Sequence, residues 1–283
     1  MRGELIYARA LSSPRVTDKF GNSWQYHSRS DDHSKVASWC ILFDLLRHSE
    51  LLRKHIAHGK VGFGINHVMN DYQNNRAKAL DMVVCTPASS GFAKRTFFDL
   101  YKDYKLALTH DELSELVSLG DVRECAVGTS LVAVEAKACM TEHVKAIPRL
   151  YDELSSSYQV VNGDTNSSIA AGYVSINIAS SFISPDRNRR KLKGTSPQVT
   201  QHKNQPNPAK LVYQKIQQLR RRSNPNEPGY DAIGISILEI RNDGTPASVG
   251  PDFGDGTRVN SSFTYDAFIE RLSTIYNSRF AAI

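Results

Sequence analysis

No stretch of this 283-residue sequence approaches the roughly 20 consecutive apolar residues that a membrane-spanning helix needs. The first residues, MRGELIYARALSSPRV, contain no apolar core of the signal-peptide type. Both absences argue against an integral membrane protein and against a secreted one. We therefore expect a cytoplasmic protein without a membrane partner.

Cysteine is also scarce, with four residues in the chain and no C-x-x-C pair. Cys40, Cys85, Cys125 and Cys139 are widely spaced, and three of them lie in apolar surroundings. This pattern is typical of buried free thiols in a reducing compartment. The sequence therefore predicts free thiols rather than a disulfide framework.

Several motifs of catalytic and cofactor chemistry are missing. There is no Walker-type loop, no G-x-G-x-x-G and no G-x-S-x-G elbow. We therefore expect no nucleotide cofactor and find no support for a serine hydrolase. His48, His55 and His58 have no cysteine or carboxylate in register to complete a zinc site, so a solvated helix face is the better interpretation.

Acidic residues are absent from one long segment. Residues 187–222 contain eleven Lys and Arg and no Asp or Glu, whereas in the rest of the chain 24 basic residues face 29 acidic ones. The formal charge of +6 therefore comes from this segment alone. Either a flexible basic loop or a polyanion-binding arm fits this composition, and nucleic acid is the commonest polyanion. The candidate DNA-binding residues are Arg187, Arg189, Arg190, Lys191, Lys193, Arg220, Arg221 and Arg222.

The hydrophobic pattern predicts an alternation of helices and strands. Residues 31–58 predict one long helix with Ser30 as its N-cap. Residues 60–69 and 79–87 predict two strands, and the polar residues 70–78 between them predict a hairpin turn.

The second half of the chain continues this alternation. Residues 97–125 predict a helical insertion, in which Thr109 and Glu112 form a capping box. The remaining expected elements are a strand with Glu135 and Lys137, a helix at 141–158 that begins or bends at Pro148, a buried strand at 169–180, a short helix at 208–222, and a strand and helix within 230–283. This order predicts one α/β domain over residues 1–283, with a mixed sheet flanked by helices.

Two predicted core strands are interrupted by charge. In SLVAVEAKAC, Glu135 and Lys137 follow four apolar residues, and they share a face because side chains two apart on a strand point the same way. Asp81 interrupts ALDMVV in the same manner. Burying a charge is costly unless it is paired or binds a metal. If the two strands are neighbours, their carboxylates converge and suit a hard cation such as Mg²⁺, which can activate water and stabilise a leaving oxygen.

At these residues the sequence resembles the PD-(D/E)XK nucleases, the restriction-endonuclease-like family. An Asp strand, an insertion, an E-x-K strand, a helix and another strand follow in that order over residues 31–180, although Leu80 stands where the motif has proline. The resemblance implies a restriction-endonuclease-like fold in which Asp81 and Glu135 hold Mg²⁺, with Mn²⁺ as a possible substitute. It implies that Lys137 positions the attacking water. Family members often add an acid from the first helix, and Asp44 and Glu50 are the candidates.

The resemblance and the basic segment together predict a function. We expect a Mg²⁺-dependent endonuclease that hydrolyses double-stranded DNA, of the type II restriction class, acting as a homodimer on a two-fold site. One alternative is a non-catalytic nucleic-acid-binding module on a nuclease-like fold. Another is a nicking or resolvase-type nuclease within a defence complex.

Overall fold

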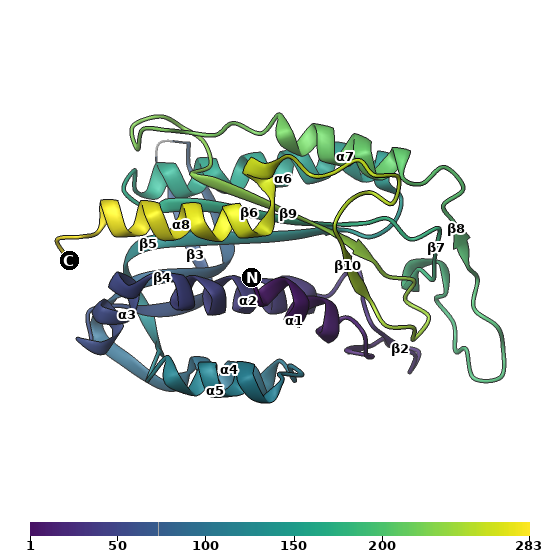
Figure 1. The fold of residues 1–283 in the computed structure, drawn as a ribbon, viewed down its shortest axis with the longest axis horizontal. Helices are drawn as coiled ribbons and strands as arrows, with labels where there is room; N and C mark the ends of the chain where they lie inside the picture. The colour runs from purple at the N-terminus through teal and green to yellow at the C-terminus, as the bar shows by residue number, and fades with distance from the viewer. Residues whose placement is uncertain (73) are drawn as a thin grey trace.

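The structure, a computed structural model, describes residues 1–72 and 74–283 and is built around a mixed six-stranded sheet with helices on both faces (Figure 1). β5 pairs antiparallel with β4 and parallel with β6, and β6 pairs parallel with β9. β3 and β4 form an antiparallel hairpin at one side of the sheet, and β10 pairs with β9 at the other. The strands are β3 (Gly62–Asp71), β4 (Arg76–Thr96), β5 (Arg123–Cys139), β6 (Ile169–Asn177), β9 (Ala232–Glu239) and β10 (Ser248–Gly250). The prediction of an α/β fold with a mixed sheet is thus confirmed.

The central strands are apolar because they are covered on both sides. All nine residues of β6 are buried, as are all residues of β9 except Glu239. Parallel strands with helices on both faces show such continuous apolar runs rather than alternation. The buried strand predicted at 169–180 is therefore confirmed as β6, and the strand predicted within 230–283 is present as β9.

Two helical layers enclose the sheet and divide the apolar core into two parts. On one face lie α1 (Gly3–Ala10), α2 (Asp32–His48), α3 (Glu50–Ala57) and α8 (Tyr265–Arg279). On the other face lie α6 (His143–Asp164) and α7 (Asn207–Gln217). The alternating residues Val132 and Val134 of β5 pack into the α2-side core, and Ala133 packs into the α6-side core.

The predicted helix at 31–58 is two helices rather than one. Ser49 has an extended backbone, and its side chain accepts a hydrogen bond from the amide of Leu52, so it caps α3. A serine at such a position satisfies a helix terminus better than it continues a helix. The N-cap of α2 is Asp31, while Ser30 accepts a hydrogen bond from the amide of Asp32.

The predicted helical insertion is present as α4 (Phe97–Asp103) and α5 (His110–Ser118). Thr109 and Glu112 form the expected capping box, and Thr96 and Asp99 form a second one at the start of α4. The insertion is anchored by stacking of Trp39 on Phe97, with ring centroids 4.7 Å apart. It therefore packs on the α2 side and leaves the α6 side of the sheet free.

The structure tests the predicted hairpin at 70–78 and the predicted start of the helix at 141–158. The hairpin predicted at 70–78 joins β3 and β4, with Asp71 paired opposite Arg76, although residue 73 lies outside the described residues. The helix predicted at 141–158 does not begin at Pro148. α6 begins five residues earlier, at His143, whose Nε2 bonds the carbonyl of Asn177 at 2.7 Å.

The basic segment 187–222 is held to the body of the protein rather than extending as a free arm. The short strand β8 (Thr200–Gln201) within the segment pairs with β7 (Ser181–Phe182), and the 3₁₀ turn at Pro185–Arg187 leads into the segment. Asn188 bonds the carbonyls of Ser184 and Gln198. The small sheet of β1 (Val16–Thr17) and β2 (Ser23–Trp24) lies nearby, and the turn between these strands supplies Asn22, which bonds the backbone of Arg190 and Leu192. A second 3₁₀ turn, Ser261–Phe263, precedes α8.

Arg222 was expected to contact DNA, but the structure places it inside the protein. Its side chain is 0% exposed and is paired with Asp231 at 2.7 Å. It also donates to the carbonyls of Pro225 and Ser168. These bonds satisfy a charge that would be expensive to bury alone, so the residue is structural.

The four cysteines are buried and unpaired, as predicted. Within residues 1–72 and 74–283, no helix combines the length and the apolar character that crossing a bilayer requires.

We predict that Arg222→Ala lowers the free energy of unfolding by about 2–4 kcal/mol, because it removes one of the two arginines that pair with the buried Asp231 and leaves the carbonyl of Ser168 without that bond. Arg220→Ala, at an exposed position two residues earlier, should change it by less than about 0.5 kcal/mol. Urea denaturation of both variants measures the difference. Equal midpoints for the two variants would contradict the structural role.

Candidate active site

The candidate site lies where β4 separates from β5. The two strands pair with Met82 opposite Val134, so the next residues, Asp81 and Glu135, stand opposite each other. Beyond this point β5 continues to Cys139 and pairs only with β6. The β4-side edge of β5 is therefore open from Ala136 onward.

A local distortion of β4 causes this separation. Leu80 packs in the α6-side core and Met82 in the α2-side core, although residues two apart on a regular strand share a face. β3, the partner strand, is irregular at the same level. Ile65 pairs with Met82 and His67 pairs with Leu80, and Asn66 between them has a φ of +50°. Asp81 therefore sits at a twist between two regular stretches of ladder.

Asp81 uses the open edge of β5. Its Oδ2 accepts a hydrogen bond of 2.8 Å from the amide of Ala136, which has no ladder partner on β4. Burial raises the pKa of Asp81, the nearby carboxylate of Glu135 raises it further, and the result is about 6. Two carboxylates thus repel each other at this position, which a cation would relieve.

Glu135 is neutralised by two lysines. Its side chain is 2% exposed, and Oε1 lies 2.7 Å from Nζ of Lys137 and 3.1 Å from Nζ of Lys78. Lys78 is fixed in turn by Ser157 and by the carbonyl of Glu153, both on α6. The two charges on the core strand are therefore paired, and the pair is anchored to the helix that covers this face.

Lys137 remains a cation. Burial is the largest single effect and would lower its pKa, but the charge and hydrogen bond of Glu135, together with the charges of Asp81 and Glu153, raise the pKa above its ordinary value. Its Nζ also lies 3.6 Å from Oε2 of Glu153. An ammonium group that holds its proton at neutral pH can donate hydrogen bonds and offset negative charge, but it does not accept a proton.

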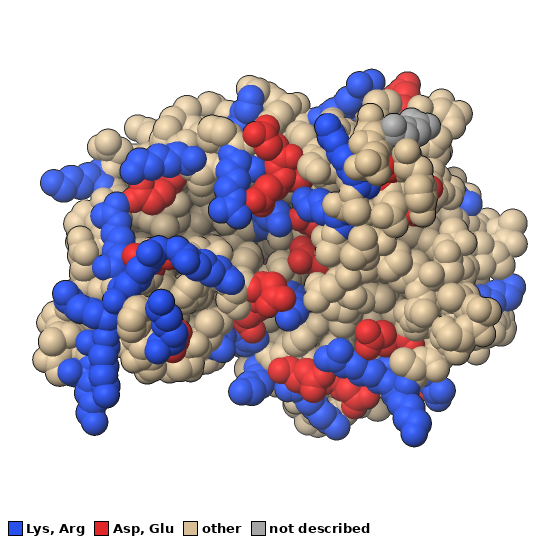
Figure 2. Space-filling view, turned by 180° about the vertical axis from the view of Figure 1, so that it is seen from behind, with Lys and Arg blue, Asp and Glu red and all other residues tan. Residues whose placement is uncertain are grey.

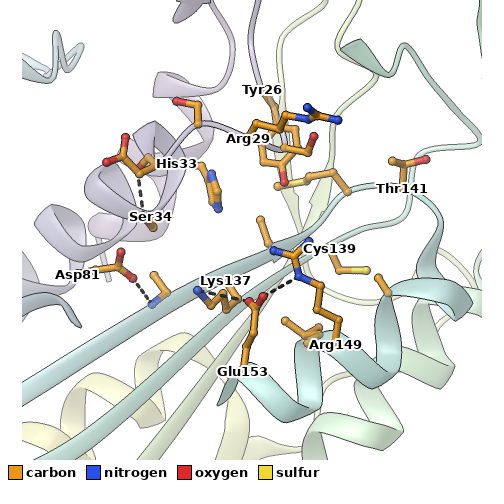
Figure 3. A pocket seen from close by; sticks show the side chains of 18 residues that line it. Tyr26, Arg29, His33, Ser34, Asp81, Lys137, Cys139, Thr141, Arg149 and Glu153 are labelled. Atoms are coloured by element: carbon orange, nitrogen blue, oxygen red, sulfur yellow. Dashed lines mark hydrogen bonds and ion pairs between the residues drawn. The ribbon is translucent and has the colours of Figure 1, made fainter. Parts of the chain in front are cut away.

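A cavity of about 490 Å³ opens over this point (Figure 3). Asp81 and Lys137 line it from the strands, and Arg149 and Glu153 line it from α6. The opposite wall carries Tyr26, Arg29, His33 and Ser34, which come from the loop before α2 and from its first turn. Glu135 is not among the lining residues and reaches the cavity through its contact with Lys137.

The two first-helix acids that the resemblance suggested lie elsewhere. Asp44 is 0% exposed and binds Arg47 and the amide of Gly3. It stands ten residues beyond Ser34 on α2, roughly 15 Å along the axis. Glu50 is exposed and pairs with Lys54. Neither residue lines the cavity, so the structure does not bring them to the other site residues.

The carboxylates fit a hard cation by their chemical type, since carboxylate oxygens are the ligands that Mg²⁺ prefers. The described residues contain no group of three or more His, Cys, Asp and Glu side chains arranged around one metal position. Asp81 faces the cavity, while both lysine contacts of Glu135 use the same oxygen, Oε1. Glu153 also lines the cavity, but its carboxylate is paired with Arg149 and lies near Lys137. A metal held by Asp81 and Glu135 would compete with Lys137 for Glu135.

A second cavity of about 330 Å³ adjoins the first, because Arg29 and Ser30 line both. Lys19 and Arg189 line the second cavity as well. Figure 2 shows this side of the molecule hollowed near its middle, with Lys and Arg gathered at its left, where β7 and β8 lie. Part of the basic segment thus borders the candidate site.

The predicted DNA-binding residues fall into two groups. The first group lies at the same end of the sheet as the cavity. It consists of Arg187, which pairs with Glu142, and of the exposed residues Arg189, Arg190, Lys191 and Lys193. Arg220 and Arg221 lie near Asp231 and Phe263, at the end where β6 and β9 begin. The candidate cavity is instead at the end where the parallel strand β5 finishes. The two groups are therefore at opposite ends of the parallel strands.

Sequence reasoning missed several lining residues, namely Tyr26, Arg29, His33, Ser34, Arg149 and Glu153. They belong to elements far from Asp81 and Glu135 along the chain, so no spacing rule connects them. The only local signal was the polar stretch SRSDDHS before an apolar helix, which marks a helix start and not a site.

The comparisons with known proteins add no relative to this picture. No protein-family model, no curated protein and no solved structure matches the chain. The functional argument therefore depends on the site itself.

We predict that Asp81→Asn stabilises the protein at pH 7.5 by about 1–3 kcal/mol, because the folded state holds an ionised carboxylate whose pKa is raised to about 6. The folded protein binds this proton more tightly than the unfolded chain does. The free energy of unfolding of the wild type should therefore fall as the pH rises from about 4 through 6.

The variant should lose that part of the pH dependence and should match the wild type near pH 4. Urea denaturation across this range measures it, with the exposed Asp152→Asn on α6 as the control. Parallel curves for the wild type and Asp81→Asn would show that the carboxylate is not under strain.

Proposed function

We propose that this protein is a Mg²⁺-dependent DNA endonuclease with a restriction-endonuclease-like fold. One observation carries the proposal: Asp81 and Lys137 face an open cavity together at the free edge of β5, with Glu135 bound to Lys137. A carboxylate pair and an ammonium group at one point are suited to phosphodiester hydrolysis, in which charge builds up on phosphate oxygens.

The arrangement of elements supports the same proposal. The resemblance implies a helix, an Asp strand, an E-x-K strand, a second helix and a further strand. α2, β4, β5, α6 and β6 follow in this order, with β4 and β6 on either side of β5. α2 and α6 cover opposite faces of the sheet and both contribute to the cavity.

Each residue has a role that its surroundings support. Asp81 and Glu135 would hold Mg²⁺, or Mn²⁺ in its place, and the ion would supply Lewis-acid stabilisation of charge on the phosphate. Lys137 orients the water and offsets the charge on the phosphate through its ammonium group. Lys78 keeps Glu135 partly neutralised when Lys137 turns toward the phosphate.

The partner that we propose is double-stranded DNA. The cavity continues into a second cavity lined by Lys19, Arg29 and Arg189, and positive side chains along a groove are the usual means of holding a phosphate backbone. Asp18 and Asp186 line it too, and Asp186 pairs with both arginines, so a phosphate would have to displace Asp186 from them. The finer proposal is a type II restriction enzyme that acts as a homodimer, since a two-fold protein matches a palindromic site.

A second candidate function follows from the state of Glu135. Two lysines neutralise it without any ion, which also suits a non-catalytic nucleic-acid-binding module. Incubation with phage and plasmid DNA, in Mg²⁺ or in EDTA, separates the two functions. Discrete Mg²⁺-dependent fragments support a restriction enzyme, a smear supports a non-specific nuclease, and a gel shift without cleavage supports the binding module.

We predict that Asp81→Ala, Glu135→Ala and Lys137→Ala each reduce cleavage by about 10²-fold or more, because each removes a group that acts on the metal or on the developing charge. Lys137→Ala should retain DNA binding. Initial rates on a plasmid substrate and gel shifts in Ca²⁺ measure the two effects.

Lys78→Ala is the matched control, because Lys78 also binds Glu135 but does not line the cavity. It should lose much less activity than Lys137→Ala. Wild-type cleavage by Asp81→Ala or Lys137→Ala would show that the site is assigned wrongly.

We predict that replacing Arg189, Arg190, Lys191 and Lys193 by Ala weakens binding to all DNA sequences alike. The salt dependence of the affinity should also become flatter, because fewer phosphate contacts release fewer counterions when the protein binds DNA. The preferred cleavage site should stay the same, since phosphate contacts position a protein and base contacts specify the sequence. Salt titrations of DNA affinity measure the slope.

The double variant Arg220→Ala, Arg221→Ala serves as the control, because these residues lie at the opposite ends of the parallel strands. Its slope should equal that of the wild type. If the salt dependence of DNA affinity falls in the control and stays unchanged in the four-fold variant, the DNA binds at Arg220 and Arg221 rather than near the cavity.

A further inference from the structure

His33 has no role in the proposed function so far, yet its ring lies within the candidate cavity. It is the second residue of α2, and it points from that helix toward the end of β5 that carries Lys137 (Figure 3). Its ring packs at a tilt against Tyr26, with centroids 5.1 Å apart. The imidazole and the Lys137 ammonium therefore face the same space from opposite walls.

The hydrogen bonding of the His33 ring is incomplete within the described part of the chain. Its Nδ1 is enclosed by the protein and forms no hydrogen bond of good geometry there, although the backbone of Ser30 lies near enough to raise the pKa of the ring. A buried polar atom without a good partner costs stability. Because Nδ1 is enclosed, a molecule in the cavity can reach the ring only through its other nitrogen, Nε2.

The surroundings keep His33 neutral. Burial lowers its pKa to about 4, and the positive charge of Lys137 contributes to this shift. A neutral imidazole has one nitrogen that carries a proton and one that accepts a proton. The charged groups around it are Lys137 of β5, Asp81 of β4, Arg149 and Glu153 of α6, Arg29 of the preceding loop, and Asp31 and Asp32 of its own helix start.

We propose that His33 is a further catalytic residue, the one that accepts the proton of the attacking water. This inference rests on the proposed nuclease function. The water gives a proton to the unprotonated ring nitrogen while its oxygen forms a bond to phosphorus. The bond between phosphorus and the leaving sugar oxygen breaks with its electron pair, that oxygen takes a proton from solvent, and the imidazolium returns its proton to solvent.

The other titratable groups that face Lys137 are less suited to this role. Lys137 keeps its own proton, because the nearby carboxylates raise its pKa. Asp81 and Glu135 are needed as metal ligands in the proposed function. Although burial alone would raise the pKa of Glu153, its ion pairs with Arg149 and Lys137 hold the pKa below its ordinary value. Burial is the main cause of the low pKa of His33, and a phosphodiester bound beside Lys137 would remove the smaller part that Lys137 contributes, which makes His33 a better base.

The experiment uses the full-length protein with Mg²⁺, a plasmid substrate, and the variants His33→Ala and His33→Gln. His110→Ala is the matched control, because His110 is exposed at the start of α5 and lines neither cavity. We expect kcat to fall by about 10²–10⁴-fold in both His33 variants, which is the usual contribution of a general base, with KM nearly unchanged. His110→Ala should cleave at close to the wild-type rate.

Chemical rescue separates proton transfer from a structural role. The cavity left by His33→Ala, within a space of about 490 Å³, can admit free imidazole. Added imidazole should restore cleavage by His33→Ala in proportion to its unprotonated fraction, and it should not restore cleavage by Lys137→Ala. Mg²⁺ is used rather than Mn²⁺ because imidazole binds Mg²⁺ weakly.

The outcomes distinguish this inference from the proposed function. If the wild type cleaves DNA and His33→Ala cleaves equally well, the inference is wrong and the nuclease proposal stands. If His33→Ala is impaired but imidazole does not rescue it at any pH, His33 is not the proton acceptor. If the wild type cleaves no DNA with Mg²⁺ or Mn²⁺, the proposed function fails and the inference fails with it.

Discussion

The buried carboxylate of Glu135 is the constraint on which the rest of the site depends. A charge that is 2% exposed inside a sheet must be paired, and two lysines perform this task, Lys137 from the same strand and Lys78 from β4. Lys78 then ties the sheet to α6 through Ser157, and Lys137 is left with its ammonium at the cavity. Satisfying this one group therefore connects β4, β5 and α6 and sets the charge on this side of the cavity.

The sequence predicted the strands and the shared face of Glu135 and Lys137, because both follow from the two-residue period of a strand. It also singled out Asp81, since a single charge within an apolar run is a local signal. That its strand is the neighbour of β5 was only a condition, which the structure meets. It did not reveal Lys78 as a second partner. That contact depends on the twist at Asp81, which in turn accompanies the left-handed backbone of Asn66 on the adjacent strand.

Other features depended on how separate elements pack, which no local pattern encodes. Asp44 was a reasonable acid on the first helix, but its position along α2 carries it to the contact with α1, where it binds the amide of Gly3. Arg222 belonged to a run of basic residues, yet its partner Asp231 draws it into the core. The long helix expected at 31–58 divides because Ser49 caps a new helix there.

The cavity combines groups whose pKa values move in different directions for one physical reason. Burial and mutual repulsion raise the pKa of Asp81, the paired carboxylate raises that of Lys137, and burial beside Lys137 lowers that of His33. The result is an ammonium and a neutral imidazole on opposite walls of one cavity, near a carboxylate whose pKa is raised. Such a set is costly to the folded protein by itself, whereas an anion beside Lys137 and a cation beside Asp81 would stabilise every member of it. This difference in free energy between the empty and the filled cavity is the strongest physical reason to regard it as a site of chemistry rather than a gap between helices.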